Sequence, residues 1–262
     1  MKRFECNLVQ FDSRLEEPKD ETVSRMATVV RETDADLIVF PELATTGYHV
    51  FDRIEDLAEP VPGPTTEELS AAAEATESEV LFGMPVEDGE AVYNSAVWLG
   101  ADGKIRARYD KRHLWGDEQD VFKRGNRYVA VETPFGRVGV QICYDLAFAE
   151  SSAALARAEC DLFVNLSAWT VKMERDWARL LPARAVEQGA YVVGCNRAGT
   201  EAGDTFCGSS MAIEPDGTVV AEMGTEAGQV TTTIDPGIVS AERRRNPIRE
   251  DRPATDADVE IR

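Results

Sequence analysis

Three segments of the chain combine a strand-like run with a reactive side chain at its end. Cys143 directly follows the run 137–142, Glu42 closes the run 36–41, and Lys111 ends a third run of the same kind. A thiol works as a nucleophile where the chain turns sharply, presents it to a cleft and offers backbone N–H groups to a developing oxyanion. Together, a thiol, a carboxylate and an ammonium predict a Glu-Lys-Cys catalytic site.

Each of these groups has a task in amide hydrolysis. Cys143 is expected to attack the carbonyl carbon, and its thiolate would be favoured by the Lys111 ammonium and by the start of a following helix, since both lower the pKa of a cysteine. Glu42 would act as general acid and base. Lys111 and the backbone N–H of Tyr144 would hold the oxyanion. The competing interpretations are a buried structural cysteine, a carboxylate that caps a loop and a surface lysine.

In order and approximate spacing, the three segments resemble the signature blocks of the nitrilase superfamily of carbon–nitrogen hydrolases, and the similarity runs from about residue 2 to about residue 235. The resemblance implies an α/β fold, a four-layer α-β-β-α sandwich with two mixed β-sheets, and assembly as a homodimer or larger homo-oligomer. Glu118, seven residues after Lys111, resembles a second glutamate that many amidase-like members use to orient the lysine or the substrate amide. The alternative for Glu118 is a solvated acid in the acidic run 117–120.

Further residues in or beside these segments could line a substrate pocket, because aromatic side chains often do so. The aromatic candidates are Tyr48, His113, Trp115, Tyr144 and Trp169. Asn165 and Ser167 match a loop that approaches the substrate in relatives. For the aromatic residues, packing in the core is an equally good interpretation.

The elements that must position these residues alternate between strand and helix, which is typical of a sheet with helices packed outside it. Strands are expected at 2–10, 37–40, 80–85, 162–166 and 190–195, and helices at 19–33, 65–78, 144–158 and 173–188. Hairpins at 91–109 and 211–222 make mixed sheets the expectation. A hydrolase domain would span residues 1–245, with a helical run at 237–245, and the polar tail 246–262 would wrap a partner subunit or be loosely ordered.

The composition limits the possible partners and cellular location. The net charge is −20, from 28 basic and 48 acidic side chains, which argues against nucleic acid and anionic membranes because both require clustered Lys and Arg. It fits a salt-adapted, halophilic protein, or an ordinary acidic enzyme. The absence of an apolar run of membrane-spanning length and of a signal peptide predicts a cytoplasmic protein. Five scattered cysteines and two histidines predict no disulfide framework and no metal site.

The leading hypothesis is a cofactor-independent amidohydrolase that cleaves a small amide or an N-carbamoyl amine through a Cys thioester and releases ammonia. A nitrilase acting on a C≡N bond is the first alternative, although relatives of that branch usually carry Trp-Glu after the nucleophile, where this chain has Tyr144-Asp145. A catalytically silent binding protein of the same fold is the second. Relatives acting on carboxylate-bearing amides commonly place an arginine near Ala147, so the alanine predicts substrates without that carboxylate.

Overall fold

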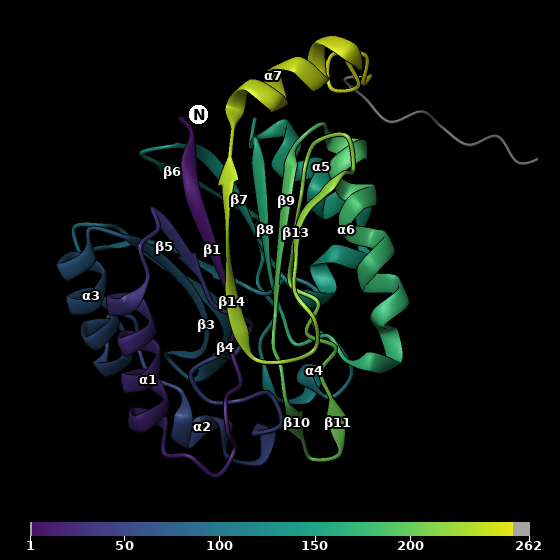
Figure 1. Cartoon of the computed structure of the whole chain (residues 1–262). Coiled ribbons are helices and arrows are strands. Elements are labelled where there is room, and N and C mark those ends of the chain that lie inside the picture. Colours follow the sequence, from purple (N-terminus) through teal and green to yellow (C-terminus); the bar gives the residue numbers. More distant parts are fainter. Residues whose placement is uncertain (1, 254–262) are drawn as a thin grey trace, which may run out of the picture.

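The structure is a computed structural model that describes residues 2–253 of the chain. Two six-stranded mixed sheets pack face to face, and helices cover the outer side of each sheet. Figure 1 shows helices α1 and α3 on one side of the strands and helices α5 and α6 on the other. The predicted four-layer α-β-β-α sandwich is therefore confirmed.

The first sheet has the order β14-β1-β2-β3-β4-β5. Strands β1, β2 and β3 run parallel, and the other three are antiparallel to their neighbours. Its elements are β1 (Phe4–Gln10), α1 (Lys19–Glu32), β2 (Leu37–Val39), α2 (Ile54–Leu57), α3 (Pro64–Thr76), β3 (Glu79–Asp88), β4 (Ala91–Leu99), β5 (Ile105–Asp110) and β14 (Gly228–Ile234).

The second sheet repeats this plan with the order β13-β12-β9-β8-β7-β6, and β7, β8 and β9 are its parallel strands. Its elements are β6 (Val129–Thr133), β7 (Gly136–Ile142), α5 (Ala149–Arg157), β8 (Leu162–Ser167), α6 (Glu174–Gln188), β9 (Tyr191–Asn196), β12 (Met211–Ile213) and β13 (Val219–Glu222). Between and after these lie α4 (Glu118–Val121), the small hairpin of β10 (Thr200–Glu201) and β11 (Asp204–Thr205), and α7 (Pro236–Arg245).

The central strands are apolar on both faces because both faces are covered. Along β2, Leu37 and Val39 join the core that also holds residues of the second sheet, whereas Ile38 joins the core that holds residues of α1 and α3. All three side chains are fully buried. Alternation of side chains in a strand thus divides one short apolar run between two cores.

Two strands of the large sheets and one helix boundary differ from the sequence expectations, and the short elements α2, α4, β10 and β11 were not predicted. Strands β6 and β14 were not predicted, and both lie at sheet edges, where half-polar strands give a weak pattern. The helix expected directly after the nucleophile is first a tight 3₁₀ turn at Cys143–Ala147, and α5 begins only at Ala149.

The tail contacts its own chain over the residues that the structure describes. Arg249 donates to the carbonyl oxygens of Gln188 and Cys160 at 2.5 and 2.6 Å, and Arg252 donates to the side chain of Gln188 at 2.8 Å. Two of these contacts lie at the C-terminal end of α6, where helix carbonyls lack partners. Residues 246–253 therefore pack against their own chain, wrapping of a partner subunit by the tail stays a prediction, and 254–262 lie outside the described residues.

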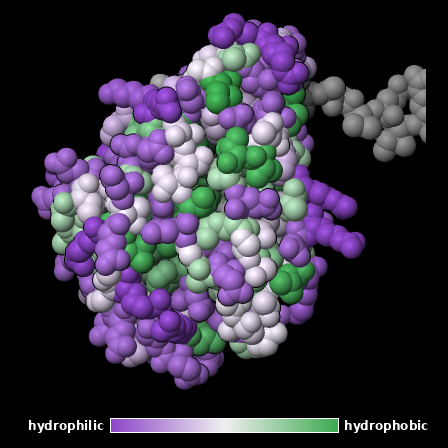
Figure 2. Space-filling view, in the orientation of Figure 1, coloured by the Kyte–Doolittle hydropathy of each residue, from purple (hydrophilic) through white to green (hydrophobic). Residues whose placement is uncertain are grey.

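The visible surface is mainly hydrophilic, with small, separate hydrophobic areas (Figure 2). Within residues 2–253, no helix combines the length and apolarity that crossing a bilayer requires.

Candidate active site

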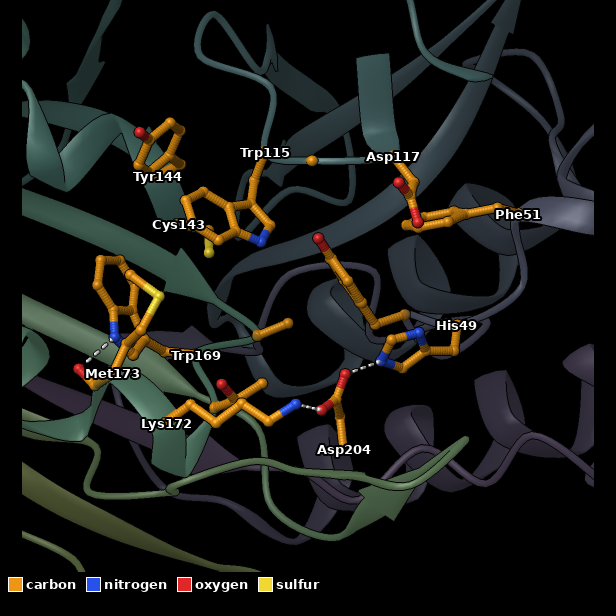
Figure 3. A pocket seen from close by; sticks show the side chains of 14 residues that line it. His49, Phe51, Trp115, Asp117, Cys143, Tyr144, Trp169, Lys172, Met173 and Asp204 are labelled. Atoms are coloured by element: carbon orange, nitrogen blue, oxygen red, sulfur yellow. Dashed lines mark hydrogen bonds and ion pairs between the residues drawn. The ribbon is translucent and has the colours of Figure 1, made fainter. Parts of the chain in front are cut away.

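A cavity of about 390 Å³ is lined by the loops that follow β2, β5, β7 and β8 (Figure 3). Four of the residues predicted to bind substrate line it, namely Tyr48, Trp115, Tyr144 and Trp169, together with Cys143. The other lining residues were not singled out from the sequence: His49, Phe51, Gly116, Asp117, Ala168, Thr170, Lys172, Met173 and Asp204. They lie in loops, whose meeting in space follows from the fold rather than from any local pattern.

The remaining predicted residues lie behind this lining and support the Cys143 turn. His113 stacks on Phe148 with ring centroids 3.9 Å apart. Asn165, buried on β8, donates from its side chain to the Cys143 carbonyl at 3.4 Å, and Ser167 donates to the Asn165 side chain. Direct contact of His113, Asn165 and Ser167 with a substrate remains a prediction.

The turn that carries Cys143 is strained in a way that exposes the thiol to the cavity. Cys143 has a φ of 45°, which places a residue other than glycine in the left-handed region. Such conformations persist where the surrounding structure holds them, and they cluster at active sites. The chain thus leaves β7 abruptly and presents Sγ at the cavity wall (Figure 3).

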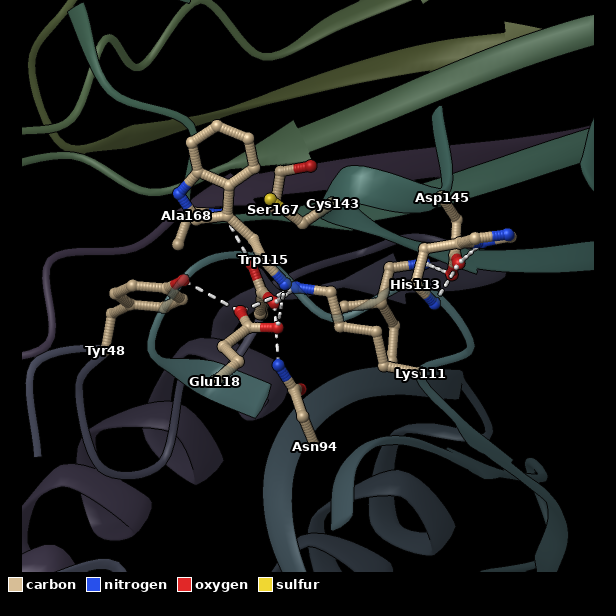
Figure 4. A network of polar contacts seen from close by, with 12 residues as sticks. Tyr48, Asn94, Lys111, His113, Trp115, Glu118, Cys143, Asp145, Ser167 and Ala168 are labelled. Atoms are coloured by element: carbon tan, nitrogen blue, oxygen red, sulfur yellow. Dashed lines mark hydrogen bonds and ion pairs between the residues drawn. The ribbon is translucent and has the colours of Figure 1, made fainter. Parts of the chain in front are cut away.

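Lys111 lies between two carboxylates in the interior (Figure 4). Its Nζ donates to Glu42 Oε1 at 2.6 Å and to Glu118 Oε1 at 2.7 Å, and all three side chains are fully buried. Burial alone would lower the pKa of Lys111, but the charges of Glu118 and Glu42 outweigh it and raise that pKa. An ammonium has three N–H groups, so one remains after these two bonds.

Further donors hold Glu42 in place. Asn94 on β4 donates to Oε1 at 2.7 Å, and the Ala168 backbone N–H donates to Oε2 at 3.0 Å. Gly83 on β3 makes room for this segment, because a Cβ atom there would lie 2.7 Å from the Glu42 Cα and 2.5 Å from the Leu43 nitrogen. Neither Asn94 nor Gly83 was singled out from the sequence, since each depends on which strand lies beside β2.

Glu118 is fixed by three donors from three different residues. Its Oε1 accepts from the Tyr48 hydroxyl at 2.7 Å in addition to Lys111, and its Oε2 accepts from the Trp115 N–H at 3.0 Å. Burial raises the pKa of Glu118, Lys111 lowers it, and Glu42 raises it further. The structure therefore brings Glu118 to the same ammonium as Glu42, and the interpretation as a solvated acid is wrong.

The pKa of Cys143 differs from the expectation. Burial raises the pKa of this thiol well above its usual value, the Glu42 carboxylate acts in the same direction, and Lys111 opposes them. The N-terminus of a helix does not lower this pKa as expected, because α5 begins six residues after Cys143. Burial and the Glu42 charge thus act against a free thiolate at this position, and the Lys111 charge acts for it.

Asp145 connects the Cys143 turn to neighbouring residues by hydrogen bonds. It was not among the predicted site residues. Its Oδ2 accepts from the Ile142 N–H at 2.9 Å and from the Tyr109 hydroxyl at 2.6 Å. Its Oδ1 contacts the His113 backbone N–H at 3.1 Å and the His113 ring Nδ1 at 2.7 Å. Asp145 is fully buried, and a sequence signal existed, since a carboxylate two residues after a nucleophile can cap its turn.

Residues 2–253 contain no group of three or more His, Cys, Asp or Glu side chains arranged to hold a metal ion. The reactive groups that these residues bring to the site are a thiol, carboxylates, an ammonium and backbone N–H groups.

Comparisons with known proteins show the family of the chain. Residues 8–244 match the family model described as carbon-nitrogen hydrolase. An omega-amidase of Xenopus tropicalis is 30% identical, with 96% of each chain covered, and a probable nitrilase of Schizosaccharomyces pombe is 32% identical over 81% of this chain and 82% of its own. A carbon–nitrogen hydrolase superfamily protein of Xanthomonas campestris has a similar structure, with a TM-score of 0.89 at 26% identity, covering 98% of this chain and all of the other.

The fold and the site define a hydrolase of the nitrilase superfamily. The chain belongs to the carbon–nitrogen hydrolase family.

Proposed function

We propose that the protein hydrolyses the carbon–nitrogen bond of a small amide or N-carbamoyl amine through a thioester on Cys143. The observation that carries this proposal is the buried Lys111 ammonium between Glu42 and Glu118, beside a cavity whose wall contains the Cys143 thiol. The similarity to an omega-amidase supports an amide as the substrate.

In the first step, Glu42 takes the thiol proton as the sulfur attacks the carbonyl carbon, and the C=O electron pair moves onto oxygen. The resulting oxyanion accepts the third N–H of Lys111 and the backbone N–H of Tyr144. Burial and the Glu42 charge raise the pKa of Cys143, which favours transfer of the thiol proton to Glu42 during the attack. A thiolate formed beforehand is not required.

In the second step, the protonated Glu42 gives its proton to the nitrogen, the C–N bond breaks, and ammonia or an amine leaves. The products are a thioester on Cys143 and an ionised Glu42. Water then loses a proton to Glu42 and attacks the thioester carbonyl. The C–S bond breaks, and the sulfur takes the proton from Glu42, which regenerates the starting state and releases a carboxylic or carbamic acid.

Glu118 is proposed to orient Lys111, because it binds the ammonium and is itself anchored by Tyr48 and Trp115. It also keeps a second negative charge beside Lys111. Glu42 can therefore take up and release a proton while Glu118 keeps the Lys111 ammonium charged.

A nitrilase is the second candidate, and the similarity to the probable nitrilase of Schizosaccharomyces pombe supports it. A nitrile attacked by the same thiol gives a thioimidate in place of a tetrahedral oxyanion. The two reactions are separated by supplying an amide and the nitrile of the same carbon chain.

The experiment that tests the proposal is an ammonia-release screen over simple amides, N-carbamoyl amines, N-carbamoyl amino acids and nitriles, run in molar salt. The Cys143→Ala variant is expected to lose turnover entirely, and the wild type is expected to show an acyl adduct on Cys143 by mass spectrometry. Cys160→Ala is the matched control, because Cys160 is buried and is not among the lining residues of the cavity. Turnover by Cys143→Ala above a few per cent would contradict the nucleophile assignment.

We further propose a cytoplasmic, salt-adapted homodimer or larger assembly that uses no cofactor. The net charge of −20 supports the salt adaptation. Sedimentation in molar salt measures the assembly, and activity after exhaustive treatment with a chelator tests the metal-free mechanism. A loss of activity that zinc restores would exclude it.

A further inference from the structure

The cavity is roomy, and several aromatic side chains line it, which bears on the substrate class of the proposed amide hydrolysis. Its volume of about 390 Å³ lies in the range of pockets that hold drug-sized ligands and exceeds the needs of an acetamide. Aromatic side chains form much of its wall: Tyr48, Phe51, Trp115, Tyr144 and Trp169. An aromatic or bulky apolar group at the end of the substrate away from the scissile amide fits such a wall.

Three of the lining residues, His49, Lys172 and Asp204, form a cluster centred on Asp204 (Figure 3). Asp204 Oδ1 binds the Lys172 ammonium at 2.5 Å, and its Oδ2 lies 3.4 Å from His49 Nε2. Asp204 belongs to the β10–β11 hairpin, Lys172 to the segment before α6, and His49 to the loop after β2. One carboxylate therefore joins three separate loops at the cavity and faces both of the groups that could bind an anion.

The balance of fixed charge at the cavity is negative. Lys172 is the one lysine or arginine among its described lining residues, and it faces Asp204. Asp117 adds a second carboxylate, and within residues 2–253 it forms no salt bridge. A substrate carboxylate entering here would meet two negative groups and a single cation that is already paired.

At Ala147 this chain lacks the arginine expected in enzymes that act on carboxylate-bearing amides. The arginines that could have taken its place do not line the cavity. Arg112 lies over the Tyr128 ring, 4.9 Å from its centroid. Arg197 is fully buried and paired with Glu201, and Arg175 is exposed on α6. Among the described residues, the structure thus offers no planar, two-pronged donor at the cavity wall for a carboxylate.

We propose that the substrate is an amide or carbamoyl compound with an uncharged aromatic or bulky apolar group, and that Asp204 determines this specificity. The Asp204 carboxylate offsets the charge of the exposed Lys172 side chain and so weakens its attraction for a carboxylate of an ω-amide. This inference rests on the proposed amide hydrolysis and concerns the group at the far end of the substrate from the scissile bond.

The test compares three amides with the same three-methylene linker and different ends. These are phenylbutanamide with a phenyl ring, pentanamide with a methyl group and glutaramate with a carboxylate. At low salt, where charges are least screened, wild-type kcat/KM is expected to be at least about tenfold higher for phenylbutanamide than for glutaramate, with pentanamide between them. A wild-type preference for glutaramate overturns the proposal.

The variant Asp204→Asn frees Lys172 and His49, so the ratio of kcat/KM for glutaramate over pentanamide is expected to rise about tenfold or more. The matched control is Asp102→Asn, which makes the same change in an exposed turn. It removes the carboxylate whose Oδ2 lies 2.8 Å from Lys104 Nζ. The double variant Asp204→Asn with Lys172→Ala should lose the gain.

An unchanged ratio in Asp204→Asn overturns the role of Asp204, whereas the wild-type ratio tests the substrate class without any variant. Ammonia release from none of the three amides, with no adduct on Cys143, would instead contradict the proposed function. These outcomes differ in what is measured and are therefore distinguishable.

Discussion

The Tyr109 hydroxyl donates a 2.6 Å hydrogen bond to Asp145, and this bond joins the two sheets beside the reactive residues. Tyr109 lies on β5, two residues before Lys111, and Asp145 lies two residues after Cys143 in the turn that follows β7. Because Asp145 also accepts from the Ile142 N–H at 2.9 Å, the ammonium and the thiol are held in fixed relative positions by one buried carboxylate.

Substituting Asp145→Asn should therefore slow turnover by about 10² or more, since small displacements of reacting groups have effects of this size. The carboxylate accepts bonds at both oxygens, and the amide nitrogen of asparagine cannot accept. Tyr109→Phe removes a single bond and should have a smaller effect. If Asp145 and Tyr109 act through one contact, a double-mutant cycle will show it. The double variant should lose less kcat, expressed as activation free energy, than the sum of the losses of the two single variants. Additive effects would contradict this coupling.

Gly83 is predicted to be required for the position of Glu42. A methyl group at Gly83 would lie within 2.7 Å of Glu42 Cα and 2.5 Å of the Leu43 nitrogen, and backbone atoms cannot move aside as a flexible side chain can. Gly83→Ala should lower kcat by about 10² and reduce the melting temperature. Gly224→Ala is the control, because a Cβ atom added at Gly224 would meet nothing within 4 Å. Equal activity of the two variants would show that Glu42 tolerates displacement.

The positions of Glu42, Lys111 and Cys143 at strand ends were predictable because each follows a strand-like run. Parallel or neighbouring strands bring such ends together, so local pattern and fold class were sufficient. Asn94 lies within a strand, and its contact with Glu42 depends on the pairing of β3 with β4. Such register-dependent contacts leave no signal in the local sequence.

Two other differences from the expectations also have physical causes. Strand β14 pairs with β1 from Phe4 with Ile234 to Gln10 with Gly228, a contact between distant parts of the chain that periodicity cannot reveal. The direction of the Cys143 pKa shift depends on burial, and burial was not known from the sequence. The nearby ammonium was predicted, but its effect is smaller than that of removing the thiol from water.

The raised pKa of Cys143 leads to a prediction about its alkylation. If the thiol keeps its proton in the folded protein, the rate of alkylation by iodoacetamide should show no inflection near pH 7, where an activated cysteine would titrate. Ionisation is expected only above the usual value of 9.0. The rate is measured in Cys160→Ala protein by mass spectrometry of the Cys143 peptide. A midpoint below about pH 7 would mean that Lys111 outweighs burial after all.

Salt is predicted to stabilise the folded protein. With a net charge of −20, repulsion among surface carboxylates favours the expanded chain, and added ions screen it with a Debye length of about 3 Å at 1 M. The melting temperature should therefore rise continuously from low salt to molar potassium chloride. Sodium and potassium chloride should act alike if screening is the cause. A melting temperature that is independent of salt would contradict the proposed salt adaptation.

Glu118 is predicted to act through Lys111, and Glu118→Gln tests this role. The substitution removes one of the two negative charges that face the ammonium at 2.6 and 2.7 Å. Glu42 then becomes the sole charged partner of Lys111 and should be a poorer acceptor for the thiol proton. We expect kcat/KM to fall by about 10² and the acyl adduct on Cys143 to form more slowly.

Two variants separate this electrostatic role from a structural one. Tyr48→Phe removes the 2.7 Å bond to Glu118 but keeps the charge, so its loss of activity should be smaller than that of Glu118→Gln. Glu90→Gln makes the same chemical change at an exposed position in the turn between β3 and β4 and should have no effect on adduct formation. If Glu118 only supported the loop of Trp115, Glu118→Gln would lower the melting temperature and leave the acylation rate of the folded protein unchanged.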